Sequence, residues 1–411
     1  MATRELISEI FHVAEAILQQ KRVADPKRWA TKELIKSDGV KIFWWSDTIP
    51  LVEILLHDLV TKSQDGYLLV SGSKKLPPLL EYATSGPPLL HQINSFIEPA
   101  LRQASIDWQP AKYHYASSTE IYVEFPSVDG VVHLLNVPNL IVRRSTQKFL
   151  VSRTPEDVFD QKTVENMWKI YTPGGPGDVP GIILDFLRPV KYQQSCNKYG
   201  SLMTDCKINI LSSTNYCAPN AIAGCVTVAW AVLMSSWKRS GFFGAGNIWA
   251  GSTCWNIDWP SYGGYANPSK CPLVESTIWK LHALLGTTND GSTNSNDTIR
   301  GAAIFGDYGL NWGFSPAFNQ PFEFAIKVTQ AGQPLLWTAQ GNWVPGEPPA
   351  GHGVVSYGYQ KSDRTLFVTL GWGSSFPDKY INYDQYSQNG CFYMSSHAIA
   401  ESKSKDILVV N

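Results

Sequence analysis

The chain has 411 residues, of which 44% are hydrophobic and 17% are charged, and its formal net charge is -1. This length predicts two or three domains with an ample core. A near-neutral charge argues against nucleic acid or an anionic membrane as the main partner, because both require a concentrated basic surface. No stretch approaches the ~18 uninterrupted apolar residues of a membrane span. We therefore expect a globular protein without a membrane span.

Helices and strands are mixed in the first part of the chain. Residues 5–21 place Ile10, Ala14 and Ile17 on one face of an amphipathic helix, and residues 89–104 have the same spacing. Runs rich in β-branched and aromatic residues predict strands at 42–45, 67–72, 121–125 and 131–135. This mixture indicates an α+β domain of about 150 residues.

A linker follows at residues 172–181, where four Gly and three Pro occur in ten residues. Such a segment forms neither a helix nor the interior of a strand. Exposed linkers are also where proteases cut most easily. We therefore place the domain boundary here, with one domain at 1–178 and the other at 179–411.

The second domain begins with a helix and ends with strands. One apolar helix is predicted at 225–238, and strand-like runs lie at 354–359, 366–370 and 390–394. A helix first and an antiparallel sheet last, within one unit of about 230 residues, fit an α+β domain with a cleft between two lobes.

All seven cysteines lie after the linker, at positions 196, 206, 217, 225, 254, 271 and 391. None has zinc spacing, so we expect no metal site. An odd number predicts six that pair and one that stays free. If Cys225 is the free one, three disulfides indicate a secreted or extracytoplasmic protein; the alternative is seven reduced thiols in the cytosol. The N-terminus has no signal-peptide core, so we expect Met1 to replace a removed signal.

Cys225 is the first candidate for catalysis. It follows the turn-rich stretch that ends at Gly224 and opens an apolar helix. There the sulfur meets unpaired backbone N–H groups and the positive end of the helix dipole, which favour the thiolate and predict a pKa below the ordinary ~8.5. The thiolate is the nucleophile in cysteine catalysis. A cysteine that opens an apolar helix is also commonly a small core residue.

His352 is the candidate base. It lies between two glycines at the start of an apolar strand, far downstream of Cys225. Small neighbours let other atoms approach the imidazole closely. A cysteine followed by a distant histidine is the papain-like order. We interpret the other seven histidines, among them His282 and His397, as hydrogen-bonded structural residues.

The segments around both candidates resemble the streptopain-type cysteine peptidases, which are papain-fold endopeptidases made as inactive zymogens. The similar segments are 223–229, 255–260, 351–355, 366–373 with its Trp-Gly element, 380–382 and, before the linker, 66–72 and 77–82. The resemblance implies a papain-like catalytic domain of two lobes, one helical and one an antiparallel sheet. It also implies that an α+β inhibitory propeptide precedes this domain.

The same resemblance implies a cysteine endopeptidase that hydrolyses peptide bonds through a Cys225–His352 thioester after propeptide removal, with no cofactor. Its partners would be protein or peptide substrates, with an apolar side chain near the scissile bond, and its own propeptide as an intramolecular inhibitor. Two alternatives stay open. One is an amidase or acyl transferase on the same fold, and the other is a catalytically weak or dead binding or adhesion protein.

Two positions depart from the family pattern. The asparagine that orients the histidine is replaced by Thr369, whose hydroxyl accepts a hydrogen bond but has a shorter reach. The glutamine that donates to the oxyanion is replaced by Pro219, which has no N–H, so Asn220 is the candidate donor. Loss of one such donor costs ~10²–10³ in rate. Trp372 is expected to shield the histidine contact from water.

Overall fold

The structure is a computed structural model that describes residues 4–36, 40–46, 48–103, 109–126, 132–137, 141–145, 154–183, 223–239, 281–288, 291–303, 314–317, 321–331, 334–341, 350–371 and 376–394. Its helices are α1 (Arg4–Ala24), α2 (Pro26–Trp29), α3 (Leu89–Gln103), α4 (Pro155–Val158), α5 (Gln161–Ile170), α6 (Cys225–Arg239) and α10 (Phe322–Gln330), with 3₁₀ helices η4 (Ser295–Ala303) and η5 (Tyr383–Gln385). The predicted helices at 5–21, 89–104 and 225–238 are confirmed as α1, α3 and α6.

The strands before the linker are β1 (Lys32–Leu34), β2 (Lys41–Trp44), β3 (Pro50–Asp58), β4 (Ser63–Ser71), β5 (Leu79–Ala83), β6 (Lys112–Ser117), β7 (Glu120–Phe125), β8 (Val132–Asn136) and β9 (Ile141–Ser145). Those after it are β10 (Ile182–Ile183), β11 (Phe314–Ala317), β12 (Leu335–Gly341), β13 (Ala350–Gln360), β14 (Thr365–Thr369), β15 (Lys379–Asn382) and β16 (Ser387–Met394). The mixture of helices and strands predicted on both sides of the linker is confirmed.

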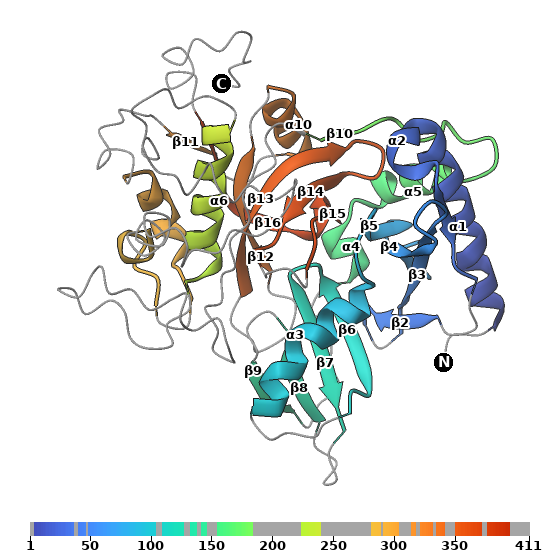
Figure 1. The fold of residues 1–411 in the computed structure, drawn as a ribbon, viewed down its shortest axis with the longest axis horizontal. Helices are drawn as coiled ribbons and strands as arrows, with labels where there is room; N and C mark the ends of the chain where they lie inside the picture. The colour runs from blue at the N-terminus through green and yellow to red at the C-terminus, as the bar shows by residue number, and fades with distance from the viewer. Residues whose placement is uncertain are drawn as a thin grey trace.

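The described strands form one sheet that crosses the predicted domain boundary. Its order is β11-β16-β12-β13-β14-β15-β5-β4-β3-β2-β6-β7-β8-β9, with β1 beside β3 and β10 beside β13. Strands pair antiparallel, apart from the parallel contact of β2 with β6. β5 and β15 join the two parts through the register Tyr380↔Tyr82 and Ile381↔Glu81. Figure 1 shows α1 and α2 at one end, next to β3–β5, and α6 beside β12 and β13.

α1 follows from its sequence pattern. Ile10, Ala14 and Ile17 are at most 2% exposed, because their helical spacing turns all three toward the sheet. α1 ends at Ala24, two residues before Pro26, as expected from the missing N–H of proline and its restriction of the preceding residue. The apolar face of α1 therefore fixes where the helix lies.

The hydrophobic core is shared by residues from both sides of the linker. One cluster combines Ile10 and Ile17 of α1 with Tyr357 of β13, Phe367 of β14 and Tyr380 of β15. A second cluster likewise draws on strands β2–β8 and on β12–β15. Two α+β domains were predicted, and in the described residues they share a sheet and both apolar clusters. The physical reason is the β5–β15 pairing, which makes one continuous surface for side chains to cover.

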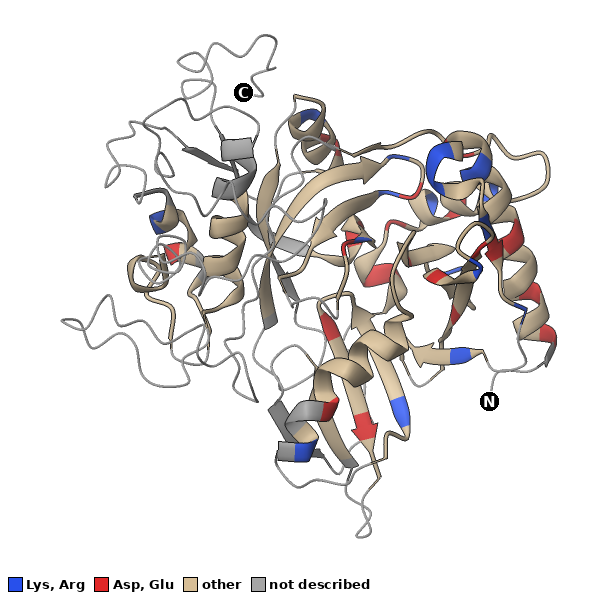
Figure 2. Cartoon of the chain, viewed as in Figure 1, with Lys and Arg blue, Asp and Glu red and all other residues tan. Residues whose placement is uncertain are grey.

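The predicted linker is irregular and exposed. Residues 172–181 form no helix or strand, and Thr172, Pro173 and Gly174 are exposed. Charged residues of both signs lie together on α1 and α2 (Figure 2). Among the described residues no helix has the length and apolar character that crossing a membrane requires. In the same residues, no three His, Cys, Asp or Glu side chains gather as metal ligands do.

Candidate active site

Cys225 is the first residue of α6, and the turn before it depends on glycine. Gly224 has φ +88, in the left-handed region that suits glycine. Its carbonyl accepts a hydrogen bond from the N–H of Val228 (3.1 Å), so the helical ladder begins there. A Cβ on Gly224 would lie 2.6 Å from the carbonyl oxygen of Gly291. The turn therefore has little freedom, and it fixes the side chain of Cys225 at the tip of the helix.

The buried side chain of His282 stabilises this turn through a hydrogen bond to its backbone. His282 is 2% exposed, and its Nδ1 lies 3.1 Å from the carbonyl oxygen of Ala223. Burial lowers the pKa of His282, which opposes its charging at neutral pH. The predicted structural role of His282 is confirmed, whereas His397 lies outside the described residues. Thr227 of α6 also contacts Thr287, with the two hydroxyl oxygens 3.2 Å apart.

β13, which carries His352, approaches the first turn of α6 at Gly353. A Cβ on Gly353 would lie 3.0 Å from Cα and 3.2 Å from the backbone nitrogen of Val226. Strand and helix therefore approach as closely as the absence of a side chain allows. The backbone of Gly353 is also close enough to Cys225 to lower the pKa of its thiol. Gly353, the neighbour of His352, thus packs against Val226, the neighbour of Cys225.

The imidazole of His352 is buried and oriented by a backbone carbonyl. The side chain is 7% exposed, and Nε2 lies 2.8 Å from the carbonyl oxygen of Leu370. A carbonyl only accepts hydrogen bonds, so this contact selects the tautomer with its proton on Nε2 and leaves Nδ1 as the basic nitrogen. Sequence reasoning missed this partner, because any residue type supplies a backbone carbonyl.

Burial makes the neutral forms of both candidates more stable. It raises the pKa of Cys225, and the backbone N–H donors of Gly353 and Val226 only partly oppose that shift. It lowers the pKa of His352 to about 4. The sequence predicted a lowered pKa for Cys225 from the helix terminus; this direction was wrong, because removal from water outweighs the dipole. Burial thus favours the thiol form of Cys225 and the neutral imidazole form of His352.

The remaining candidates from the sequence are less well placed. Thr369 ends β14, beside Leu370, and is 3% exposed. Its hydroxyl has no hydrogen-bond partner among the described residues, so the contact with His352 that we predicted for Thr369 is made instead by the neighbouring backbone. Asn220 and Trp372 lie outside the described residues, as do Pro219 and the side chains of the six other cysteines. Cys225 itself is a free thiol.

Comparisons with known proteins add little to this geometry. No protein-family model matches the chain, and no curated protein matches it either. Among solved structures, a fragment of prointerpain A from Prevotella intermedia is similar, with a TM-score of 0.40 and 13% identity over 86% of this chain and 98% of that chain. At this degree of similarity, the function has to be argued from the site itself.

Proposed function

We propose that the protein is a cysteine endopeptidase, made as a zymogen, in which Cys225 is the nucleophile and His352 the base. The observation that carries the proposal is the close approach of the two segments: a Cβ on Gly353, next to His352, would lie 3.0 Å from Cα of Val226, next to Cys225. A second support is the Leu370 carbonyl, which leaves Nδ1 of His352 as the basic nitrogen. A nucleophile, a base and a group that orients the base are the parts that thiol acyl transfer needs.

The reaction proceeds in two acyl transfers. Nδ1 of His352 takes the thiol proton as the sulfur of Cys225 bonds to the peptide carbonyl carbon, and the carbonyl oxygen becomes an oxyanion. His352 then gives that proton to the leaving amine as the C–N bond breaks, which leaves a thioester on Cys225. In the second transfer His352 removes a proton from water as the hydroxide attacks the thioester carbonyl carbon. The C–S bond then breaks, His352 returns the proton to the sulfur of Cys225, and a carboxylic acid is released.

The helix terminus supplies oxyanion stabilisation in this scheme. The backbone N–H of Cys225 lies in the first turn of α6, where N–H groups have no partner within the helix. Asn220 is the proposed second donor. An N–H group held in place by the helix is oriented before the reaction, and such preorganised donors stabilise developing charge strongly. The proposed substrates are extended peptides with an apolar side chain near the scissile bond.

The N-terminal part, residues 1–178, is the proposed propeptide, and cleavage in the linker is the proposed activating cut. Thr172, Pro173 and Gly174 are exposed and lie in no helix or strand, as a protease requires of a site. Pairing of the six other cysteines would place the protein in an oxidising, extracytoplasmic compartment.

The alternative is a papain-fold binding protein without catalysis. The shifted pKa values of Cys225 (raised) and His352 (about 4) favour it, because both oppose a reactive thiolate. An amidase or acyl transferase would keep the same two residues and differ in its acceptor or substrate.

Self-processing separates these functions. Purified protein should cleave itself within residues 172–181, seen on a denaturing gel, and Cys225→Ala and His352→Ala should stay intact. A peptide library digested by the processed protein then distinguishes an endopeptidase from an amidase. The rate of iodoacetamide labelling of Cys225, mapped by mass spectrometry, tests the alternative. If Cys225 is labelled no faster than a buried thiol and the protein does not process itself, the binding protein is favoured.

A further inference from the structure

A buried ion pair joins the two parts of the chain where β5 meets β15. Nζ of Lys379 lies 2.7 Å from a carboxylate oxygen of Glu81, and both side chains are 0% exposed. The hydroxyls of Tyr67 and Tyr115 also donate to Glu81, the latter over 2.9 Å. Gln92 of α3 lies 3.3 Å from the same ammonium. Lys379 therefore has these two partners only while β5 and β15 stay together, whereas Glu81 would keep its two tyrosines and lose its cation.

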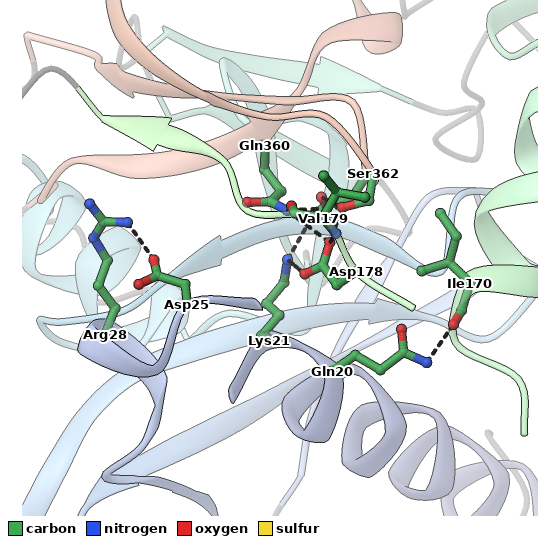
Figure 3. A network of polar contacts seen from close by, with 10 residues as sticks. Gln20, Lys21, Asp25, Arg28, Ile170, Asp178, Val179, Gln360 and Ser362 are labelled. Atoms are coloured by element: carbon green, nitrogen blue, oxygen red, sulfur yellow. Dashed lines mark hydrogen bonds and ion pairs between the residues drawn. The ribbon is translucent and has the colours of Figure 1, made fainter. Parts of the chain in front are cut away.

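A second buried cluster joins α1 to the turn between β13 and β14. Nζ of Lys21 lies 3.1 Å from Asp178 and 2.9 Å from Asp363, with all three side chains at most 2% exposed. Gln360 and Ser362 donate to the same Asp178 carboxylate. Figure 3 shows Lys21 pointing from α1 toward Asp178, beside Gln360 and Ser362. Asp178 follows the proposed cut site at 174–177, so the ion pairs of Lys21 with Asp178 and Asp363 connect the two sides of that site.

Aromatic contacts extend the same junction. The rings of Tyr82 and Tyr380 stack with centroids 4.4 Å apart and planes 10° apart. The rings of Phe96 in α3 and Phe376 pack edge to face, with their centroids 5.4 Å apart. Lys21 lies over the ring of Tyr82, with Nζ 4.6 Å from its centroid. Apolar, hydrogen-bonded and ionic contacts thus all occur at the boundary between the parts of the chain before and after the linker.

Separation of the two parts would break together those of these contacts that cross the boundary, namely the Lys379–Glu81 pair, the Lys21 pairs and the Tyr82–Tyr380 and Phe96–Phe376 ring contacts. It would expose the unpaired edges of β5 and β15, which are poorly tolerated in water. It would also uncover aromatic side chains of both parts, and in any partly separated state Lys379 or Glu81 would remain buried without its partner. The linker itself makes few contacts at Gly174 and Gly177, where a Cβ would meet nothing within 4 Å.

We propose that a cut between Gly174 and Gly177 leaves a two-chain protein, in which the N-terminal fragment stays bound through β5, α1 and α3. Release then requires a second event that opens the β5–β15 pairing, such as further digestion of the N-terminal fragment. This inference deepens the zymogen part of the proposed function. Activation becomes a two-step process in which linker cleavage is necessary and insufficient.

The test uses the full chain with Cys225→Ala and a site-specific protease sequence at 174–177, so that the result does not depend on catalysis. After complete cutting, a denaturing gel shows two fragments. We expect native size-exclusion chromatography to give one peak at the mass of the uncut chain, down to nanomolar protein. Fragments that elute separately without denaturant would overturn the proposal, whether or not the wild-type protein is a peptidase.

Matched variants test the buried pair. Lys379→Met should weaken association of the cut fragments by about 10²-fold or more, because it leaves Glu81 buried without its cation. The double change Glu81→Met with Lys379→Met should restore most of the affinity, because no charge is left buried. Lys75→Met is the control, since its pair with Glu156 is exposed (64% and 42%). Equal affinities for the Lys379 and Lys75 variants would refute the role of the pair.

Discussion

The approach of β13 to α6 gives a sharp prediction for Gly353→Ala. The added Cβ would lie 3.0 Å from Cα and 3.2 Å from Cγ2 of Val226, tighter than ordinary contact. Because the first of these atoms is backbone, the helix tip or the strand must move by several tenths of an ångström. Such overpacking costs about 1–3 kcal/mol of unfolding free energy. A shift that approaches 1 Å between reacting groups costs about 10² in rate.

Gly358→Ala is the matched control, because it lies on the same strand with similar crowding. There a Cβ would lie 2.9 Å from the carbonyl oxygen of Ile182 and 3.0 Å from Cβ of Phe367, away from Cys225. Urea unfolding measures the stability cost, and iodoacetamide labelling of Cys225 with peptide hydrolysis measures the effect on the site. We expect similar stability losses and a large functional loss only for Gly353→Ala. Equal functional losses would refute the proposed contact.

Three further predictions concern pH and support of the site. Burial raises the pKa of Cys225, and His352, with a pKa of about 4, is neutral at higher pH. The rate of iodoacetamide labelling of Cys225 should therefore rise steadily toward alkaline pH. A labelling rate that is level from about pH 5 to pH 8 would instead reveal a thiolate–imidazolium pair. Burial raises the pKa of Glu53 from 4.5 to about 7, so its contribution to stability is lost as pH rises through that window, and Glu53→Gln should flatten the fall in unfolding free energy there. His282→Ala should cost about 1–3 kcal/mol, because the carbonyl of Ala223 loses a buried donor; it should also slow labelling of Cys225, and an unchanged rate would show that the turn does not depend on His282.

The prediction for Glu53 depends on its surroundings. Its carboxylate accepts hydrogen bonds from the N–H groups of Leu89 and Leu90 at the start of α3, which lower its pKa, while burial raises it more. The charges that face it are Glu81, which raises its pKa, and Lys379, which lowers it. Gln keeps an oxygen acceptor for the helix terminus, so Glu53→Gln isolates the proton. Wild-type and variant curves that stay parallel between about pH 4.5 and pH 7 would contradict the assignment.

The junction between β5 and β15 carries a weak signal in the sequence. Glu81 is the only charged residue of β5, and every residue of that strand is buried. Lys379 likewise begins a strand whose residues are all buried. A single charge within an apolar run suggests a buried partner of opposite sign. The pattern does not say which of the many oppositely charged residues is that partner, so the pairing was not predicted.

The sequence alone determined the local elements of this protein. Periodic apolar residues define α1 and α3, the turn ending at Gly224 starts α6 at Cys225, and the Gly- and Pro-rich run defines the linker, because these preferences act over a few neighbouring residues. Only the tertiary structure decided the rest. The contact of Cys225 with the strand of His352, the direction of their pKa shifts and the sheet shared across the linker depend on burial and register between distant segments, which no local pattern encodes.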